Sequence, residues 1–558
     1  MRTRGLALLT VAVLAFTACS PAAAPSASGA PPASVAPGAS APATSAAPST
    51  AAGGGVTDTL QMHWLGDLTA IWHPASQETF SQAINFQLMF DKLLERKWDG
   101  DTWKPVGDLA DTWDISPDGL TWTFHLHPGV KWHDGEAFTA NDVAFTVSRA
   151  LLNTKRNPQN AWAAVVGVDK VTDPNAIASG VKVIDDNTIS LTLDAPNADF
   201  VSDLTDLPAF IVPQHILKDT DPKAVETIEF STTKPIGTGP YKFVKYETDQ
   251  FSQFEANPDY FMGAPKIKNI FVKRLLGDQA IAQLEAGDLD LSIRLNPAEQ
   301  ARLEKVPTLD VLSTSGVGTY GPYMNLLTLT DVKTREAIAR GVDAQGIIDS
   351  IYGGAGHINR GVLPGMPAAD DQVFFDYDPA KAKELLDASS WDKSKPLRIV
   401  FDKSFAGVEQ WTPIMQQNLE AIGFKVELMG LETTAAIEMY DKIDQFDVTI
   451  AQGGAQGVSP FASQIYFSCK QTEPAHYKTY SRNCAIDDGF VAARKEIDDT
   501  KRTEIFKSVS KLINNEIEKV SWWTTNALSA KVKRLDGVTI PPDTREFITG
   551  VQNWVLNP

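Results

Sequence analysis

The sequence predicts an α/β protein, and three kinds of local pattern support that class. Residues 59–64 alternate between apolar and polar side chains, which is typical of a half-buried strand. Residues 116–119 (Ser-Pro-Asp-Gly) form a turn before another alternating stretch, because proline presets φ and glycine accepts a positive φ. Residues 502–517 instead carry apolar side chains at helical spacing. Strands and helices mix throughout, without the steady strand–helix rhythm of a single barrel.

The other elements follow from capping residues and from the period of the apolar side chains. Thr139 is a suitable N-cap for a helix over residues 139–152. Asp378 and Pro379 open another helix as cap and first-turn proline. The remaining predicted elements are a helix over 79–94 and strands over 120–126, 426–428 and 446–450.

The composition excludes several classes of protein. The chain has 558 residues, with 50 Lys and Arg against 69 Asp and Glu, and a formal charge of −19. So acidic a chain is a poor partner for nucleic acid or for an anionic membrane surface, since both attract basic residues. No apolar run reaches the ~18–20 residues that span a bilayer, which excludes a multi-pass membrane protein. Hydrophobic residues make up 43% of the chain, which excludes wholesale disorder.

The first 55 residues precede the folded part of the chain. Residues 1–18 combine two early arginines with a short apolar run, which is typical of a secretory signal peptide. The tetrad at 16–19 (Phe-Thr-Ala-Cys) resembles the lipobox of bacterial lipoproteins, with phenylalanine where leucine is usual. This resemblance implies cleavage before Cys19 and acylation of its thiol; the alternative is ordinary signal cleavage near residues 22–24. Residues 19–55 are rich in Ala, Pro, Ser and Gly and uncharged, which predicts a disordered stalk.

Five collinear blocks from residue 57 onward point to a known family. The most specific block is residues 109–149, LADTWDISPDGLTWTFHLHPGVKWHDGEAFTANDVAFTVSR. The others cover residues 236–246 with 256–270, 284–292, 331–354 and 492–536. Together they resemble the extracytoplasmic solute-binding proteins, family 5, the peptide, nickel and oligosaccharide class that serves ABC importers.

The resemblance implies a periplasmic-binding-protein-like α/β fold of type II, in which two hinged lobes are built from three domains. Domain I is expected to comprise residues 57–98, 225–322 and 522–558. Domain II is an inserted lobe, residues 99–224, and domain III is the far lobe, residues 323–521. Ligand is expected between domains I and III, where hinge closure would bury it.

The resemblance also implies a disulfide between Cys469 and Cys484, because dipeptide-binding members carry paired cysteines at this place. Disulfides persist in exported proteins. Two free buried thiols are the alternative. A metal site there would need further ligands, since only His476 lies between the two cysteines.

Two motifs that suggest a cofactor or a metal have simpler explanations. Residues 316–321 fit G-x-G-x-x-G, but Pro322 and an extended stretch follow, whereas a dinucleotide site needs a helix there. We expect a glycine-rich crossover into domain III. His125 and His127 share one face of a strand with His133 nearby, and a solvated strand face of domain II is the expected role. The sequence contains no G-x-S-x-G or H-E-x-x-H motif, and we expect no cofactor, no metal and no catalytic residue.

The most informative departure from the family concerns the ligand. Peptide-binding relatives carry an acidic residue that pairs with the peptide's α-amino group, but residues 450–460 contain no Asp or Glu. Gln452 and Gln456 suit an uncharged polar ligand such as an oligosaccharide, or a peptide held through its backbone. Asp444 or Asp447 is the alternative anchor. By position, eight residues are expected to contact ligand: Trp64, Trp72, Tyr323, Asn325, Gln452, Gly453, Gly454 and Gln456.

These expectations combine into one function. We expect a monomeric binding lipoprotein of an ABC importer that captures a peptide or an oligosaccharide and delivers it to the membrane permease and its ATPase. It would be anchored through Cys19 at the outer face of the cytoplasmic membrane, in the periplasmic space, and would not be an enzyme. The alternatives are an exported hydrolase acting on a similar substrate, and a sensor or interaction protein that uses the fold without transport.

Overall fold

The computed structural model describes most of the chain that follows the predicted stalk. The described residues are 58–558 apart from 65–71, 75–79, 99–102, 153–160, 206–208, 276, 360, 364–373, 404–406, 441, 443, 454–459, 468, 470–478, 480 and 540–547. The predicted signal peptide, Cys19 and the stalk lie outside them. The described residues belong to one compact unit of the chain.

Eleven of the described strands form one large sheet. Its first part is built around β1 (Thr59–Trp64), which pairs in parallel with β10 (Asn269–Lys273) on one side and β11 (Leu291–Leu295) on the other. β9 (Phe251–Ala256) and β8 (Tyr241–Glu247) continue the sheet beyond β10 in antiparallel order. These five strands are called the β1 half below.

The other part of the sheet is parallel at its far edge. β14 (Pro396–Asp402) pairs in parallel with both β15 (Lys425–Leu431) and β16 (Val448–Gly453). These three strands are called the β14 half below. They confirm the predicted strands over 426–428 and 446–450.

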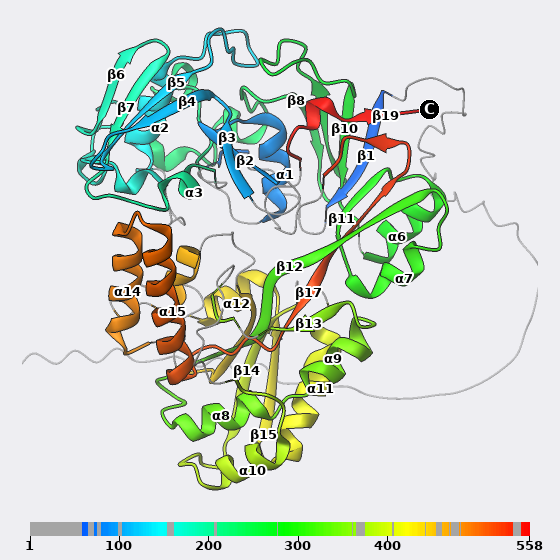
Figure 1. Ribbon diagram of the computed structural model, residues 1–558. Helices are drawn as coiled ribbons and strands as arrows, with labels where there is room; N and C mark the ends of the chain where they lie inside the picture. Colours follow the sequence, from blue (N-terminus) through cyan, green and yellow to red (C-terminus); the bar gives the residue numbers. More distant parts are fainter. Residues whose placement is uncertain are drawn as a thin grey trace, which may run out of the picture. The chain divides into compact units, whose positions relative to one another are not determined.

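Two long antiparallel strands join the halves. β12 (Leu309–Met324) pairs with β17 (Trp523–Val532) along most of its length and with β16 at its end, as Figure 1 shows in green and red. The short strand β13 (Gly356–Ile358) pairs with the other side of β17. The pairing of β12 with β17 shifts register between Ser315 and Thr319. The stretch from residue 315 to 322, with residues 520–526 opposite, is called the crossing.

The glycines of the crossing allow its two strands to approach closely. A Cβ atom on Gly321 would overlap the carbonyl oxygen of Val520, and one on Gly316 would overlap that of Thr525. The G-x-G-x-x-G motif therefore lies inside a strand and does not open a helix, as predicted. The glycines at these two positions let the backbones of the two strands come close together, which is a different role from the phosphate binding of a dinucleotide motif.

A second sheet of four strands lies between β3 and β8 in the sequence. Its order is β4 (Ala110–Ile115), β5 (Thr121–Leu126), β7 (Thr188–Thr192) and β6 (Val181–Asp185). The predicted turn joins β4 to β5, with Gly119 at φ +71°. A separate hairpin, β2 (Leu94–Trp98) with β3 (Trp103–Gly107), precedes this sheet.

Side-chain caps explain several of the helix starts. Thr139 caps α2 (Ala140–Arg149) in a capping box with Asp142. Asp378 caps α10 (Pro379–Asp387), with proline at the first turn as predicted. The predicted helix over 502–517 is α15 (Asp499–Glu516), which begins three residues earlier because Asp498 caps it.

One predicted helix is too long. The apolar spacing over 79–94 continues beyond the observed helix α1 (Phe80–Met89), and β2 already begins at Leu94. Leu93 and Leu94 pack into the apolar core of the four-stranded sheet, whereas the residues of α1 pack on the β1 half. The spacing therefore runs across the boundary between two cores.

The remaining helices cover the sheets. They are α3 (Phe200–Thr205), α4 (Gln214–Leu217), α5 (Glu229–Thr232), α6 (Gly277–Ala286), α7 (Gln300–Leu303), α8 (Val332–Arg340), α9 (Ala344–Ile351), α11 (Val408–Ala421), α12 (Thr433–Tyr440), α13 (Gln464–Phe467) and α14 (Cys484–Lys495). A final two-residue strand pair, β18 (Leu535–Asp536) and β19 (Val555–Leu556), closes the chain.

α14 contacts the body of the four-stranded sheet. The backbone carbonyl of Arg494 accepts a hydrogen bond from the Ala198 amide at 2.9 Å. Its guanidinium lies 3.6 Å from Asp203 and 4.0 Å from Asp199. The same guanidinium also lies over the ring of Phe461. The contacts with Ala198, Asp199 and Asp203 join chain segments nearly 300 residues apart and are made by half-buried and buried groups.

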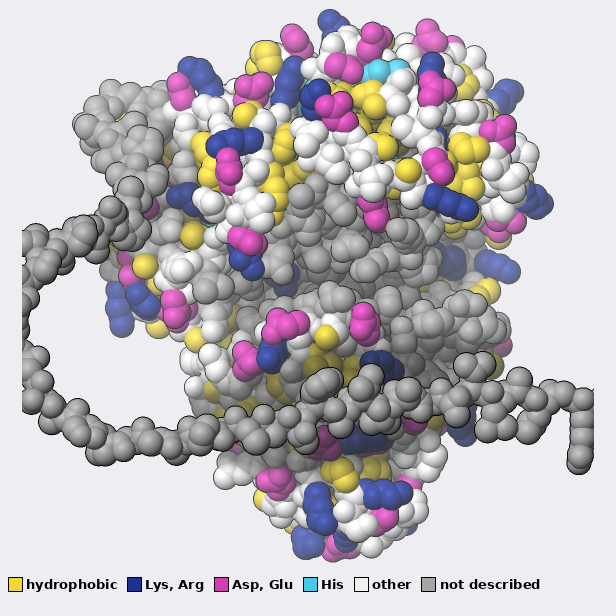
Figure 2. Space-filling view, turned by 180° about the vertical axis from the view of Figure 1, so that it is seen from behind, with side chains coloured by type: hydrophobic (Ala, Val, Ile, Leu, Met, Phe, Trp, Pro, Cys, Tyr) yellow, Lys and Arg dark blue, Asp and Glu magenta, His cyan; other side chains and the backbone are white. Residues whose placement is uncertain are grey.

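The described surface is mixed in charge. On the face shown in Figure 2, acidic and basic side chains alternate with small apolar patches. Within the described residues, no helix combines the length and the apolar character that crossing a bilayer requires.

Candidate ligand-binding site

The carboxyl ends of the parallel strands in the β1 half point toward the crossing. β11 runs antiparallel to β17, with Leu291 opposite Lys531 and Leu295 opposite Leu528. Its carboxyl end therefore lies nearer to the start of β17, which comes from the crossing. Because β1 is parallel to β11, its last residue, Trp64, lies at the same edge.

The strands of the β14 half point toward the crossing from the opposite side. β16 runs antiparallel to β12, with Val448 opposite Met324 and Gly453 opposite Thr319. Thr319 is where the register of β12 shifts. β14 and β15 are parallel to β16, so the carboxyl ends of all three face this place. Open α/β sheets bind ligands outside the carboxyl ends of their strands, and here two sets of ends meet.

A buried histidine fixes the strand ends of the β1 half. His63 is 1% exposed, and its Nε2–H donates to the carbonyl of Leu275 at 3.1 Å. Its Nδ1 lies 2.8 Å from the hydroxyl of Ser292, which donates to it because the ring is neutral. Burial lowers the pKa of His63 to about 4. His63 therefore ties β1 to β11 and to the segment after β10, and has no nitrogen left for a ligand.

Aromatic rings of the crossing pack against one another and against Trp411 of α11. Tyr320 stacks on Trp523 with ring centroids 5.5 Å apart, and Trp411 lies edge-on to Trp523 at 4.9 Å. Burial raises the pKa of Tyr320, and the positive charge of Arg294 opposes that rise. Arg294 belongs to β11 of the β1 half, whereas Tyr320 lies in the crossing.

Three of the predicted ligand residues lie at these strand ends. Trp64 ends β1, and Gln452 and Gly453 end β16. Gln452 and Gly453 pair with Tyr320 and Thr319 of the crossing. The other two predicted members of this loop, Gly454 and Gln456, lie outside the described residues.

Two predicted ligand residues are instead part of the apolar cores. Trp72 is 1% exposed, and its ring packs 4.8 Å from Phe243. Tyr323 is also 1% exposed and packs 5.5 Å from Tyr466. Trp72 follows β1 and Tyr323 lies at the expected domain boundary, which is why both were predicted to contact ligand. Their side chains instead point into the apolar cores.

Asn325 has a structural role in the β14 half. Its side chain is fully buried, and its Nδ2 donates to the carbonyl of Phe446 at 3.0 Å. Its Oδ1 accepts from the amide of Leu327 at 3.1 Å. These bonds tie the end of β12 to the segment before β16, so we withdraw Asn325 as a ligand residue.

The alternative acidic anchor is already paired. Asp447 is 2% exposed, and both its carboxylate oxygens accept from the guanidinium of Arg398, at 2.9 and 3.0 Å. The backbone amide of Arg398 donates to the same carboxylate at 2.9 Å. A bidentate pair of this kind satisfies a buried carboxylate, which leaves it unsuited to a ligand's ammonium group. Asp444 contributes its backbone carbonyl to the same guanidinium.

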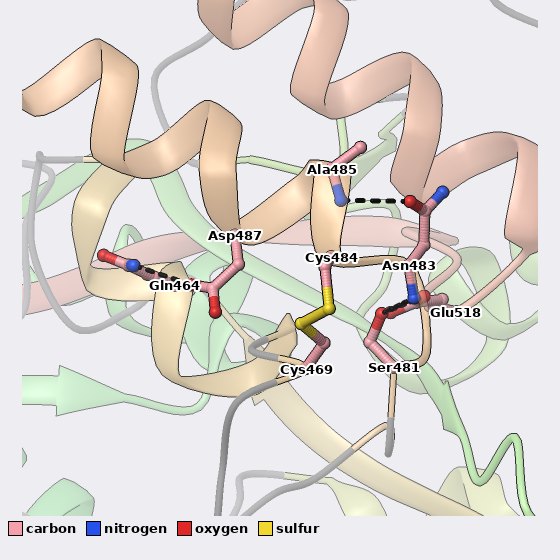
Figure 3. The surroundings of a disulfide bond; sticks show 8 residues. All are labelled: Gln464, Cys469, Ser481, Asn483, Cys484, Ala485, Asp487 and Glu518. Atoms are coloured by element: carbon pink, nitrogen blue, oxygen red, sulfur yellow. Dashed lines mark hydrogen bonds between the residues drawn. A yellow bond between two sulfur atoms is a disulfide. The ribbon is translucent and has the colours of Figure 1, made fainter.

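The disulfide implied by the family resemblance is present. Cys469 and Cys484 are bonded, with their Cα atoms 5.2 Å apart, as Figure 3 shows. Beside it, the hydroxyl of Ser481 donates to the buried carboxylate of Glu518 at 2.6 Å (Figure 3). The hydroxyl of Thr479 donates to the same carboxylate at 3.0 Å. Cys469, Thr479 and residues 481–495 are called the stapled segment below.

The histidines of the four-stranded sheet have protein partners. His125 lies 2.9 Å from the carboxylate of Asp114, and His133 lies 2.9 Å from the carbonyl of Gly239. Across the described ranges, no group of three or more His, Cys, Asp or Glu side chains is arranged to hold a metal ion.

A cavity of about 260 Å³ lies beside β13 and the first residues of the β17 side of the crossing. Asp343, Ile358, Tyr377 and Trp522 are among the residues that line it. None of the predicted ligand residues is among its described lining residues.

Sequence reasoning missed Arg294. It follows Ser292 and Ile293 near the end of β11, so its alternation with apolar neighbours gave only a strand signal. Its place at the site depends on strand pairings with residues more than 200 positions away.

Comparison with known proteins places this chain among proteins that bind solutes. A family model described as bacterial extracellular solute-binding proteins, family 5, matches residues 104–474. A putative ABC transporter peptide-binding protein of Brucella ovis is 30% identical over 452 residues, covering 78% of this chain and 82% of that protein. The dipeptide-binding protein of Escherichia coli strain K12 is 26% identical over 481 residues, covering 81% and 87%.

Solved structures agree in fold. The oligopeptide-binding protein AppA from Bacillus subtilis, in complex with a nonapeptide, matches with a TM-score of 0.78 and 21% identity. That match covers 91% of this chain and all of the other. NikZ from Campylobacter jejuni, in complex with Ni(L-His), matches with a TM-score of 0.75 and 21% identity over 89% and 99% of the chains. These matches confirm the predicted periplasmic-binding-protein-like α/β fold.

Proposed function

Because the chain belongs to the bacterial extracellular solute-binding proteins, family 5, we propose that it captures a peptide-class solute and delivers it to the permease of an ABC importer. The observation that carries this proposal is the meeting of two sets of strand ends at one crossing. A solute held there touches both halves of the sheet, so its capture is coupled to their relative position.

The crossing is suited to act as a hinge. β12 and β17 are the two strands that connect the halves within the described sheet, and the register shift between Ser315 and Thr319 interrupts their pairing there. Hinges are a few residues that absorb changes of φ and ψ. Closure around the solute is driven by its higher affinity for the closed form. The three-domain division with boundaries at residues 98, 224, 322 and 521 is part of this proposal.

A peptide is the favoured solute because of the proteins that this chain resembles, and the site itself bears on how the peptide would be held. The relatives at 30% and 26% identity carry the names of peptide-binding and dipeptide-binding proteins. Asp447 is held by Arg398, and residues 450–460 contain no acid, so an ammonium anchor of the dipeptide-binding kind is not provided there. We propose a peptide held through its backbone and side chains, with an oligosaccharide as the competing class.

The cellular setting follows from the N-terminal sequence. We propose that cleavage before Cys19 and acylation of its thiol attach the protein to the outer face of the cytoplasmic membrane, with residues 19–55 as a stalk. The matched relatives are named as binding proteins, which supports a carrier without catalytic activity. A monomeric state is part of the same proposal.

A thermal-shift panel tests the function. It compares dipeptides, longer peptides, oligosaccharides and Ni²⁺ chelates with the protein purified free of ligand. A ligand that binds only the folded form stabilises it by about 2.7 kcal/mol at a hundredfold excess over Kd. We expect saturable stabilisation by peptides without turnover. Hydrolysis of the ligand during incubation would establish the enzyme alternative instead.

Two controls sharpen this panel. N-acetylated peptides should bind as well as free ones, because Asp447 is paired with Arg398 and residues 450–460 contain no acid; loss of binding on acetylation contradicts this. The mass of the mature protein extracted from membranes should include acyl chains on Cys19, and a chain beginning beyond residue 22 contradicts lipidation.

A further inference from the structure

The four-stranded sheet is fixed to the β1 half. The ring of His133 accepts from the amide of Gly237 at 3.2 Å and donates to the carbonyl of Gly239 at 2.9 Å, just before β8. Helix α2 belongs to both apolar cores, because Val143 packs with the four-stranded sheet whereas Phe145 packs with the β1 half. These contacts hold the two bodies to one another, and together they are called the joined block below.

Helix α14 is instead fixed to the β14 half. Ile486 and Phe490 of this helix pack in one apolar cluster with Tyr323. Tyr323 belongs to β12 and pairs with Thr449 of β16. The disulfide of the stapled segment holds the first residue of the helix. A movement about the crossing would therefore carry α14 with the β14 half and separate it from the joined block.

The carboxyl end of α14 is completed by a group from the joined block. The last carbonyls of a helix have no partner within the helix itself. The carbonyl of Arg494, the last residue but one of α14, accepts from the amide of Ala198 at 2.9 Å. Ala198 comes two residues before α3, and Figure 1 shows α14 and α3 facing one another. A backbone hydrogen bond thus joins the joined block to α14 at a place outside β12 and β17.

The side chain of Arg494 makes further contacts with the same two bodies. Its guanidinium lies 3.6 Å from Asp203 and 4.0 Å from Asp199, which both belong to the joined block. It also stands 4.5 Å from the centroid of the Phe461 ring, which packs in the apolar cluster of α14 and α15. A ring face attracts a guanidinium, so Phe461 holds the cation in position toward the two acids. The contacts of Arg494 with Ala198 and the two acids are called the latch below.

We propose that the latch stabilises the closed form of the protein, so that Arg494 raises the affinity for the solute without touching it. The inference rests on the proposed function, in which the halves close around a solute by bending at the crossing. Separation of the halves breaks the latch, because it pulls α14 away from α3. The affinity for a ligand that binds the closed form rises with the fraction of the protein in that form. Arg494 is thus a positioning residue, and the four-stranded sheet serves as the support against which α14 closes.

The test measures the binding of alanine peptides, from dipeptide to nonapeptide length, to the wild type and to Arg494→Ala. Arg502→Ala is the matched control, since Arg502 pairs with Asp499 within α15. We expect Arg494→Ala to bind about three- to tenfold more weakly, mainly through faster dissociation, as befits partly exposed ion pairs. Raising the salt from about 0.1 M to about 1 M should weaken binding to the wild type more than to Arg494→Ala.

Two further measurements identify the latch itself. The effect of Arg494→Ala on affinity should shrink in an Asp203→Asn background, because the partner is already neutral. Small-angle X-ray scattering of the ligand-free protein should give a larger radius of gyration for Arg494→Ala than for the wild type and Arg502→Ala.

The outcomes separate this inference from the proposed function. Equal affinity and an equal radius of gyration in wild type and Arg494→Ala overturn the latch and leave peptide binding intact. So does a lower unfolding midpoint of Arg494→Ala with unchanged affinity, which indicates a purely structural role. If no peptide binds while an oligosaccharide does, the peptide proposal fails, and the radius of gyration of the ligand-free protein still decides whether Arg494 holds the two bodies together.

Discussion

The crossing and the stapled segment border the same part of the β14 half but are held together by different forces. At the crossing, two strands pair through backbone hydrogen bonds, and glycines allow their close approach. The stapled segment is held by the Cys469–Cys484 bond and by hydroxyl donors to the buried carboxylate of Glu518. The first arrangement aligns two strands through backbone hydrogen bonds. The second fixes one segment against its neighbours.

Glu518 connects the two regions. It immediately precedes the β17 side of the crossing, and its carboxylate accepts from Thr479 and Ser481 of the stapled segment. Its backbone carbonyl accepts from the amide of Met324 at the end of β12. If the crossing is the hinge that we propose, the stapled segment fixes the chain on one side of it.

The largest effect is expected from Gly321→Ala in the crossing. The added Cβ would overlap the carbonyl oxygen of Val520, and backbone atoms cannot give way as a flexible side chain does. We expect a loss of more than about 3 kcal/mol in unfolding free energy, measured by urea denaturation. Gly263→Ala is the control, since it has a positive φ but open space, and should cost about 1 kcal/mol. Equal costs would show that the close approach is not needed.

Removal of the Cys469–Cys484 disulfide is expected to have the next largest effect. The bond closes a loop with a sequence separation of 15, so the double variant Cys469→Ser and Cys484→Ser should lose about 3 kcal/mol. Differential scanning calorimetry measures the loss, and peptide affinity should change little because the strand ends remain in place. A strong loss of affinity would mean that the stapled segment shapes the site directly.

The pH dependence of stability tests the connecting residues. Burial raises the pKa of Glu518 to about 7, so the folded state holds a proton that the unfolded state has lost above about pH 4.5. Its contribution is therefore full below pH 4.5 and is lost as pH rises to 7. Burial lowers the pKa of the neighbouring Lys519 to about 7, so its contribution is full above pH 10.5 and is lost as pH falls to 7.

Substituting Glu518 should remove the loss of stability between pH 4.5 and 7, and substituting Lys519 should remove the loss between pH 10.5 and 7. Relative to Glu518→Gln, the wild type should lose on the order of 2–3 kcal/mol between pH 5 and pH 8. Relative to Lys519→Met, it should gain stability between pH 8 and pH 10. Urea denaturation across pH measures both differences. Parallel profiles for wild type and variants would mean that neither group titrates with a shifted pKa.

The smallest effect is expected from Arg494→Ala, which tests whether α14 of the stapled segment is held against α3. The ion pairs are partly exposed, at 3.6 and 4.0 Å, and the backbone bond from Ala198 remains. We expect a loss below about 1 kcal/mol at low salt that disappears at high salt. Arg502→Ala, which breaks a pair within α15, is the control. A loss that salt does not change points to packing on Phe461 instead.

The sequence predicted turns and helix starts correctly where a capping or turn residue fixes the local backbone. The turn at 116–119, the cap at Thr139 and the Asp378-Pro379 start were all predicted, because each depends on contacts within a few residues. The helix over 79–94 was predicted too long, because a change of core partner at Leu93 leaves no mark in the apolar spacing.

The sequence by itself determined the family, the order of the elements and the disulfide pairing, since these are carried by collinear motifs and by nearby residues. Only the tertiary structure decided which side chains face the site. It turned Trp72 and Tyr323 into the cores, satisfied Asn325, paired Asp447 with Arg398 and placed Arg294 at the meeting of the halves. The physical reason is that burial and strand pairing join residues far apart in the chain, and a shift of one residue in strand register is enough to reverse the direction of a side chain.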